Sequence, residues 1–173
     1  MREEKVLLDA TLGFLIKGDK ILLAKKAKKI GAGCWNGYGG GINEGESPKE
    51  AMAREFNEEA NIIVDESSLE KVAIIYFHNT KSDGNKFICK VYVYFVKKWQ
   101  GDPIETEEML CPTWFRFDSL PFDNMMPTDK VWMPEILSGK KIIAKAYLGP
   151  FQKESLANVE VEFVDKFIDD SDA

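Results

Sequence analysis

Residues 39–62 read GGGINEGESPKEAMAREFNEEANI, three glycines followed by a segment that carries six glutamates. This segment has the signals of a capped helix. Ser47 can accept a hydrogen bond at the N-terminus, Pro48 suits the first helical position, and Glu50 completes a capping box. Asn61 tolerates the left-handed conformation that often ends a helix. The stretch therefore predicts an acidic helix directly after a flexible glycine segment.

Acidic side chains share one face of the predicted helix. At about 100° per residue, Glu55, Glu58 and Glu59 fall within an arc of about 100°. Their mutual repulsion has two explanations: a solvated acidic face, or a site for a hard divalent cation such as Mg²⁺ or Mn²⁺, which prefers oxygen ligands. Only Lys49 and Arg54 are near enough in the sequence to neutralise the charge. The pattern favours the metal site.

The other faces of the helix predict how it packs. Phe56, Ala60 and Ala53 lie on an adjoining face and are expected to contact a sheet, whereas Ala51 is expected to leave open space beside the carboxylates. Glycines at positions 37, 39, 40 and 41 let the backbone approach a ligand closely. Their spacing matches neither a Walker loop nor the dinucleotide-binding fingerprint.

Composition limits the class of protein. The 173 residues are 45% hydrophobic and 30% charged, with a net charge of -6, which indicates a soluble globular domain and argues against a nucleic-acid binder. No apolar run is long enough to span a membrane, and the N-terminus lacks a signal-peptide cleavage site. Cys34, Cys89 and Cys111 lack metal-ligand spacing and are expected to be free thiols in a reducing cytosol. His78, the only histidine, is expected to be a packed or surface residue.

Strand patterns surround the helix. Residues 6–26 predict two strands around a Gly18–Asp19 turn, and residues 72–99 predict a second pair with a turn at 82–85. The remaining expectations are a glycine-rich loop at 31–41, strands at 113–117, 141–148 and 159–164, a second helix over 127–139 capped at Thr128 or Asp129, and a frayed tail at 169–173. Strands dominate over two helices, so the fold class is α+β or a mixed-sheet α/β sandwich.

The spacing of the helix residues resembles a family motif. Gly40, Glu46, Arg54, Glu55, Phe56, Glu58, Glu59 and Ile62 resemble the Nudix box, G-x5-E-x7-R-E-U-x-E-E-x-G-U. Two positions depart from it: Asn61 replaces the second glycine, and Phe56 is larger than the usual aliphatic residue. Residues 31–46, 100–109 and 114–132 also resemble the MutT-type oxidised purine nucleoside triphosphatases, the 8-oxo-dGTP diphosphatases. The resemblance covers about residues 5–164. It implies the Nudix α/β/α sandwich, with a mixed β-sheet between helices, in a single domain over residues 1–173.

The resemblance implies a metal site. Mg²⁺, with Mn²⁺ as a possible substitute, would be held by Glu55, Glu58, Glu59, Glu108 and the Gly39 carbonyl. Arg54 would orient the glutamates through charge-assisted hydrogen bonds. Water would attack the triphosphate bridge and give a nucleoside monophosphate and pyrophosphate. The resemblance leaves open whether Glu58, Glu59 or Glu108 acts as the base.

The resemblance also implies a base pocket. It maps onto Thr11, Asn36, Met126, Thr128, Asp129 and Trp132. Asn36 and Asp129 match the polar residues that read the purine edge, although each has a plain alternative, a turn residue for Asn36 and a helix cap for Asp129. The departures from the family are Met126 for a stacking tryptophan, Thr128 for the first of two aspartates, and Ile30 and Asn79 for two phenylalanines.

These observations predict an Mg²⁺-dependent nucleoside triphosphate pyrophosphohydrolase acting on oxidised purine nucleotides. Two alternatives stay open: hydrolysis of another nucleoside diphosphate linked to a group X, and a nucleotide-binding module without catalysis. The expected partner is a small-molecule nucleotide, with no nucleic-acid or membrane partner. The protein is expected to be a cytoplasmic monomer.

Overall fold

The computed structural model describes residues 4–168, so the expected fraying of 169–173 lies outside the described residues. Within this range there are two α-helices, α1 (Pro48–Ala60) and α2 (Asp129–Leu137). The strands are β1 (Asp9–Lys17), β2 (Lys20–Lys26), β3 (Trp35–Asn36), β4 (Tyr38–Gly41), β5 (Leu69–Thr80), β6 (Lys86–Val96), β7 (Met109–Arg116), β8 (Lys141–Leu148) and β9 (Glu160–Val164). Short 3-10 turns are η1 (Glu66–Ser68), η2 (Phe122–Asn124) and η3 (Pro150–Gln152).

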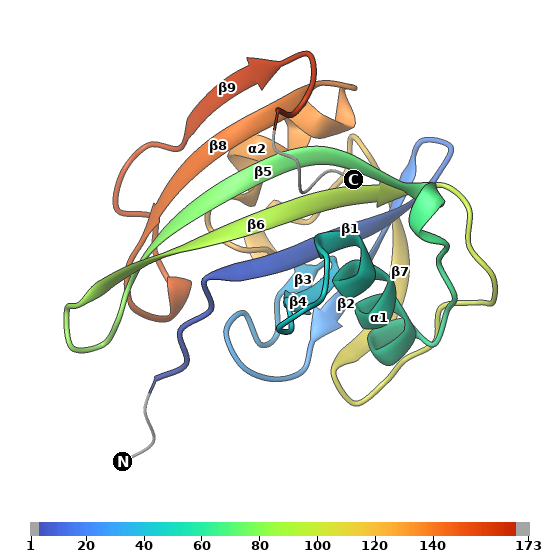
Figure 1. Ribbon diagram of the computed structural model, residues 1–173, viewed down its shortest axis with the longest axis horizontal. Helices are drawn as coiled ribbons and strands as arrows, with labels where there is room; N and C mark the ends of the chain where they lie inside the picture. Colours follow the sequence, from blue (N-terminus) through green and yellow to red (C-terminus); the bar gives the residue numbers. More distant parts are fainter. Residues whose placement is uncertain (1–3, 169–173) are drawn as a thin grey trace.

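The strands form one mixed sheet in the order β3-β2-β1-β6-β5-β8-β9, with β4 paired to β1 and β7 paired to β2 (Figure 1). The pairs β1–β6 and β5–β8 are parallel, and the other pairs are antiparallel. Strand β1 joins the two halves, because it pairs with β6 and β4 along most of its length and with β2 at its end. The predicted mixed sheet is confirmed.

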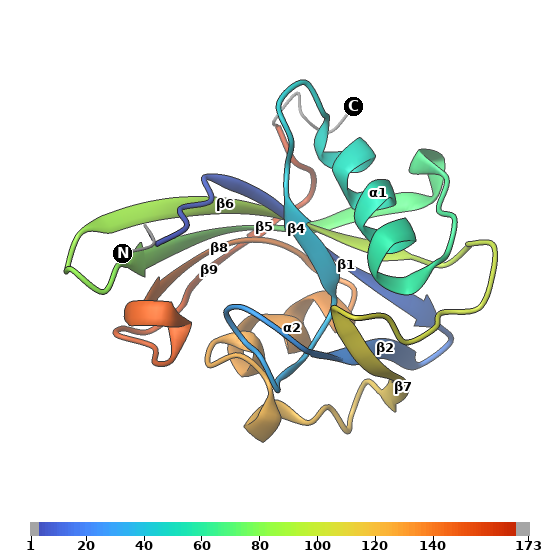
Figure 2. The same ribbon diagram turned by 90° about the horizontal axis from the view of Figure 1, so that it is seen from below.

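The two helices cover opposite faces of the sheet (Figure 2). Neighbouring residues of one strand point to opposite faces. Phe14 of β1 accordingly packs in the core under α2, which includes Trp132, whereas the next residue, Leu15, packs under α1 beside Phe56. This two-sided core makes the α/β/α sandwich that the Nudix resemblance implied.

Helix α1 packs more closely on β1 than the sequence predicted. Phe56 is fully buried, as expected, but Ala53 is only half-buried and Met52 is fully buried in its place. The expected open space at Ala51 is also wrong, because Ala51 is fully buried. Gly13 of β1 leaves room for the two large side chains of this face, because an added Cβ would lie 2.7 Å from both the Met52 sulfur and the Phe56 ring.

The glycine segment predicted as a loop contains strands β3 and β4, which is a second correction. Gly40 of β4 pairs with Thr11 of β1, and Gly39 pairs with Leu12. A Cβ on Gly39 would lie 2.0 Å from the Thr11 carbonyl oxygen, so only glycine permits this approach. The glycines therefore bring β4 tightly against β1 and set the position of the backbone beside α1.

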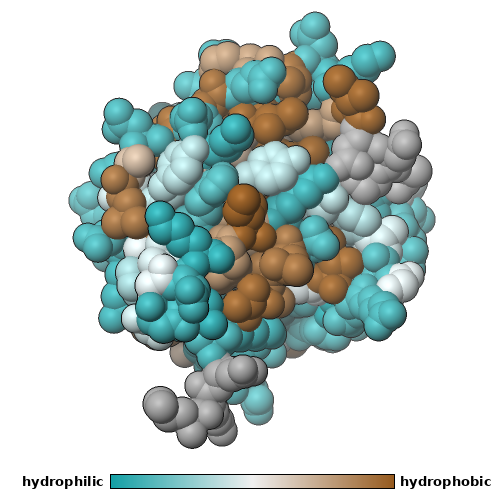
Figure 3. Space-filling model, turned by 60° about the vertical axis from the view of Figure 1, so that its left-hand side comes forward, coloured by the Kyte–Doolittle hydropathy of each residue, from teal (hydrophilic) through white to brown (hydrophobic). Residues whose placement is uncertain are grey.

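The surface is mainly polar. Figure 3 shows one face on which hydrophilic side chains surround a group of apolar side chains near the centre. Val6, Leu8 and Ile88 are among the exposed large apolar residues. Some apolar exposure is normal for a folded domain. No helix within residues 4–168 is long and apolar enough to cross a membrane.

Candidate active site

Helix α1 begins and ends as its sequence predicts. The Ser47 side chain accepts a hydrogen bond from the Glu50 backbone N–H at 3.1 Å, and Pro48 is the first helical residue. Asn61 has φ 55° and ψ 39°, and its N–H donates to the Asn57 carbonyl at 3.1 Å. These caps define which turn of the helix faces the glycine segment.

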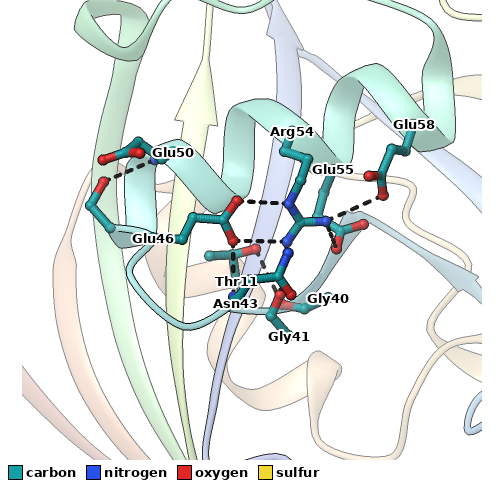
Figure 4. A network of polar contacts seen from close by, with 10 residues as sticks. Thr11, Gly40, Gly41, Asn43, Glu46, Glu50, Arg54, Glu55 and Glu58 are labelled. Atoms are coloured by element: carbon teal, nitrogen blue, oxygen red, sulfur yellow. Dashed lines mark hydrogen bonds and ion pairs between the residues drawn. The ribbon is translucent and has the colours of Figure 1, made fainter.

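Arg54 joins the helix to the chain before it (Figure 4). Its Nε and Nη2 donate to the two oxygens of Glu46 at 2.7 and 3.0 Å, and Nη2 also donates to the Gly41 carbonyl at 3.0 Å. Its Nη1 donates to Glu55 at 2.9 Å and to Glu58 at 3.2 Å. These hydrogen bonds hold the pKa of Glu46 below its usual value and raise the pKa of Arg54. Arg54 thus positions two carboxylates of the predicted metal site.

We expect Arg54→Lys to lower the free energy of unfolding by about 2–3 kcal/mol, because an ammonium group cannot replace the bidentate contact with Glu46. Urea denaturation in EDTA measures the change. The matched control is Arg116→Lys, since the Arg116–Asp118 pair is exposed and should contribute less than about 1 kcal/mol. Similar losses in both variants would contradict a special role for the Arg54 network.

Two carboxylates of α1 are buried and one is exposed. Glu55 and Glu59 are 8% and 3% exposed, whereas the Glu58 side chain is 55% exposed. Glu59 accepts a hydrogen bond from the Gly39 N–H at 2.8 Å. Burial raises the pKa of Glu59 to about 8, and burial also raises the pKa of Glu55 against the opposing effect of Arg54. Buried carboxylates of this kind are stabilised by a cation when they ionise.

Gly40 lies directly beside the acidic cluster. A Cβ on Gly40 would come within 2.5 Å of a Glu55 carboxylate oxygen. The lack of a side chain at Gly40 therefore leaves room for the Glu55 carboxylate between β4 and α1. This explains why the glycines and the acidic helix occur together in the sequence.

A fourth carboxylate joins the cluster from another part of the chain. The charge of Glu108 raises the pKa of both Glu55 and Glu59. Its backbone carbonyl accepts a hydrogen bond from the Ala27 N–H at 2.9 Å, where β2 ends beside β7. The charge of Glu108 thus acts on both buried carboxylates of α1, and its role as a metal ligand stays a prediction.

Lys26 was not among the predicted site residues, but its charge interacts with two of them. Lys26 is half-buried at the end of β2, and burial lowers its pKa while the charges of Glu59 and Glu108 oppose that effect. In the sequence it belongs to the run KKAKK, which reads as a solvated charge cluster. Only the pairing of β2 with β7 shows that it lies beside the acidic cluster.

The donor set fits a hard divalent cation. Within residues 4–168, no three His, Cys, Asp or Glu side chains are arranged so that they could hold a metal ion. Glu55 and Glu58 accept hydrogen bonds from Arg54, and Glu59 accepts one from the Gly39 N–H. However, all the candidate ligands are oxygens, and two of the carboxylates are buried with raised pKa values. Glu58 is exposed enough to change rotamer, so its side chain can leave Arg54 for a metal ion.

Four of the six residues predicted to read the base lie at or near the start of α2, and the other two, Asn36 and Thr11, lie in β3 and β1. Thr128 and Asp129 are buried, and Trp132 is 1% exposed with no hydrogen-bond partner for its Nε1 in the described chain. Met126 contacts the loop after β2, since a Cβ on Gly31 would lie 2.9 Å from its sulfur. The position of Thr11 in β1 directs it to the α1 face, where its hydroxyl donates to the Gly40 carbonyl at 3.4 Å.

Asp129 is the first residue of α2 and does not act as its N-cap. Thr128 occupies the N-cap position without a side-chain cap hydrogen bond. The Asp129 carboxylate instead accepts from the Met126 N–H at 3.1 Å through Oδ2, and Oδ1 has no partner within residues 4–168. Burial raises the pKa of Asp129 to about 7. A neutral or charged carboxyl group with one free oxygen is thus available at this position.

Asn36 and Cys34 connect the two halves of the site. The Asn36 side chain accepts from the Gly37 N–H at 2.8 Å, which leaves its amide N–H groups available. Burial raises the pKa of the Cys34 thiol, the Asp129 carboxylate raises it further, and Lys26 lowers it. The Cys34 thiol is therefore affected by charges from both α2 and the end of β2.

Comparison with known proteins identifies the family of the chain. The NUDIX domain family matches residues 7–136. The chain is 33% identical over 160 residues to the oxidized purine nucleoside triphosphate hydrolase of Mus musculus, covering 91% of this chain and 96% of that protein. It is 34% identical over 133 residues to the Danio rerio protein of the same name, covering 77% and 81% of the two chains.

A solved structure shares the fold. The mutator MutT protein of Bacillus halodurans superposes with a TM-score of 0.74 at 22% identity, over 90% of this chain and 98% of that one. At this identity the match speaks for the fold alone. Together with the family match over residues 7–136, it leads to one conclusion: the chain belongs to the Nudix family.

Proposed function

We propose that this Nudix pyrophosphohydrolase uses Mg²⁺ to hydrolyse oxidised purine nucleoside triphosphates, such as 8-oxo-dGTP, to the monophosphate and pyrophosphate. Nudix hydrolases act on small-molecule nucleotides with a divalent metal. The observation that carries the proposal is the buried pair Glu55 and Glu59 beside Gly39 and Gly40. Its relatives named for oxidised purine triphosphates supply the substrate class.

The carboxylates of Glu55, Glu58, Glu59 and Glu108, with the Gly39 carbonyl, would hold the metal. A bound divalent cation supplies positive charge to the phosphate oxygens and lowers the pKa of a water molecule. Arg54 keeps Glu55 in position by its hydrogen bond. Lys26 contributes a positive charge beside Glu59 and Glu108, where it can contact a phosphate.

The reaction adds one water across a phosphoanhydride bond. The water oxygen bonds to phosphorus, the bond between the α- and β-phosphates breaks, and pyrophosphate leaves. The proton released by the water passes to a carboxylate of the cluster, for which Glu58, Glu59 and Glu108 are the candidates. Glu55 and Glu59 are buried away from bulk water, and this strengthens the electrostatic interactions that they make in the site.

The residues at the start of α2 would hold the base. Asp129 offers a buried carboxyl oxygen to the purine edge, and Asn36 offers amide N–H groups. Met126 would cover a face of the base with a softer surface than an aromatic ring. Thr128 supplies a hydroxyl where the family has an aspartate. The protein therefore presents fewer hydrogen-bond acceptors to the purine edge.

A nucleotide panel tests the proposal. The wild-type protein is incubated with Mg²⁺, Mn²⁺ or EDTA and with 8-oxo-dGTP, dGTP, dCTP or a nucleoside diphosphate sugar, and products are followed by ³¹P NMR. We expect pyrophosphate from 8-oxo-dGTP with Mg²⁺ and none with EDTA. Cleavage of the nucleoside diphosphate sugar and of no triphosphate would contradict the proposed substrate class but support the proposed pyrophosphohydrolase reaction. No cleavage with either metal would indicate a nucleotide-binding module. The monomeric state and cytoplasmic location stay predictions.

A further inference from the structure

A buried carboxamide interrupts the apolar face of β5. Every second residue of this strand faces α2, and Ala73 and Ile75 accordingly lie in the core that contains Trp132. Phe77 continues this face and packs against the same core. Asn79 follows at the next alternate position and is only 5% exposed. A polar side chain thus stands where the strand pattern calls for an apolar one.

Gln152 is the partner of this carboxamide. Its Nε2 donates to Asn79 Oδ1 at 2.8 Å, and Asn79 Nδ2 donates to the Phe77 carbonyl at 3.2 Å. Within residues 4–168, Gln152 Oε1 accepts no hydrogen bond, and the residue is partly exposed. One acceptor and one N–H of the Gln152 carboxamide are therefore available to a ligand.

The backbone fixes Gln152 in an unusual conformation. Phe151 and Gln152 have φ values of 57° and 56°, a region that side-chain-bearing residues seldom adopt. The Gln152 N–H donates to the Gly149 carbonyl at 3.0 Å, and the Leu156 N–H donates to the Tyr147 carbonyl at 2.8 Å. These bonds order the η3 loop, and the Asn79–Gln152 hydrogen bond links η3 to the end of β5, which gives the Gln152 side chain a defined direction.

The pair lies on the side of the sheet that carries the proposed base site. In Figure 2 the orange-red segment near residue 150 is on the same side of the sheet as α2. Asn79 is one alternate position, about 7 Å of strand, beyond Phe77, which packs in the cluster of Trp132. Asp129 and Trp132 approach the base site from α2, and the two carboxamides belong to the β5 end of the same face.

We propose that Gln152, positioned by Asn79, reads the oxidised edge of the purine and is a specificity-determining residue. This inference rests on the proposed function. An 8-oxopurine carries an N–H at N7 and a carbonyl at C8, which together form an amide-like edge. The Gln152 carbonyl can accept from N7–H while its N–H donates to the C8 oxygen. An unmodified purine has a lone pair at N7 and a C–H at C8, so it cannot form both bonds.

Gln152→Gly tests this assignment, because glycine accepts the φ of 56° without strain and removes only the carboxamide. The ratio of kcat/KM for 8-oxo-dGTP to that for dGTP measures discrimination at C8. The ratio for 2-oxo-dATP to dATP measures discrimination at C2, on the opposite edge. We expect the first ratio to fall about tenfold and the second to stay within about twofold. Lys153→Ala, an exposed neighbour, is the matched control and should change neither ratio.

The possible outcomes separate this inference from the proposed function. If Gln152→Gly lowers all rates equally and leaves the ratio for 8-oxo-dGTP to dGTP unchanged, with or without a fall in melting temperature, Gln152 is only a loop anchor and the inference is overturned. A wild-type enzyme that hydrolyses 8-oxo-dGTP and dGTP equally also overturns it, and in both cases pyrophosphohydrolase activity stands. A wild-type enzyme that releases pyrophosphate from no purine triphosphate overturns the proposed function and this inference together.

Discussion

Replacement of Glu59 by glutamine is expected to lower kcat by about a thousandfold at saturating Mg²⁺ and to leave the fold intact. Glu59 is 3% exposed, receives the Gly39 N–H, and lies within electrostatic reach of Glu55 and Glu108. Glutamine keeps the shape of the side chain and can still accept from Gly39. It lacks the negative charge that a divalent cation requires, so the loss reports on the proposed metal site.

The stability of the same variant provides an independent readout. Burial raises the pKa of Glu59 to about 8, so without metal the folded protein keeps this proton while the unfolded chain releases it near its ordinary value of 4.5. The wild-type contribution to stability therefore falls as the pH rises from about 5 to 8. Glutamine has no proton to release. In EDTA, Glu59→Gln should be more stable than wild type at pH 8 and nearly equal to it at pH 5.

The matched control for this experiment is Glu50→Gln, which changes an exposed glutamate on the same helix. Its kcat should stay within about twofold of wild type, because Glu50 lies outside the acidic cluster. Melting temperatures in EDTA and steady-state kinetics with Mg²⁺ cover both readouts. Near wild-type turnover of Glu59→Gln at saturating Mg²⁺ would show that Glu59 is not a metal ligand.

The second large effect is expected at the base. Asp129→Ala should lower kcat/KM for 8-oxo-dGTP about ten- to a hundredfold and should change kcat/KM for dCTP by less than about threefold. Asp129 is buried, and its Oδ1 has no partner in the described chain. Alanine removes this acceptor, so the purine edge loses the hydrogen bond that it would form with Asp129. Steady-state kinetics on both nucleotides measure the selectivity ratio.

A structural role for Asp129 makes a different prediction. The Asp129 carboxylate accepts from the Met126 N–H, so alanine also removes a bond that orders the start of α2. Loss of that bond alone would lower the melting temperature and would reduce kcat/KM for all substrates equally. A fall in stability with an unchanged purine-to-pyrimidine ratio would therefore reject base recognition. The companion change Met126→Trp restores an aromatic surface and should lower KM for the preferred purine.

The local signals in the sequence were strong where chemistry and conformation depend on neighbouring residues. The caps at Ser47 and Asn61 are observed, because they need only residues within one turn. The shared face of Glu55, Glu58 and Glu59 follows from helical geometry alone. The Nudix resemblance then implied the mixed sheet between helices, which the structure confirms.

Packing between distant segments was predicted less well. The sequence suggested a loop at residues 31–41, but the lack of side chains at Gly39 and Gly40 lets this segment pair with β1. Ala51 is buried and Ala53 is half-buried, the reverse of the prediction, and Met52 and Phe56 of the same helix pack where Gly13 lacks a side chain. Such approaches depend on two segments at once, so the pattern of one segment cannot reveal them.

The acidic helix, its caps and the kind of cation that its carboxylates suit could be predicted from the sequence, because these depend on residue type and on spacing within one helix. Tertiary structure decided which groups surround those carboxylates. It buried Glu55 and Glu59, brought Glu108 and Lys26 to them through the pairing of β2 with β7, and directed Thr11 away from α2. It also joined Asn79 to Gln152, 73 positions away in the chain. Burial and long-range pairing set pKa values and hydrogen-bond partners, and neither is encoded in local spacing.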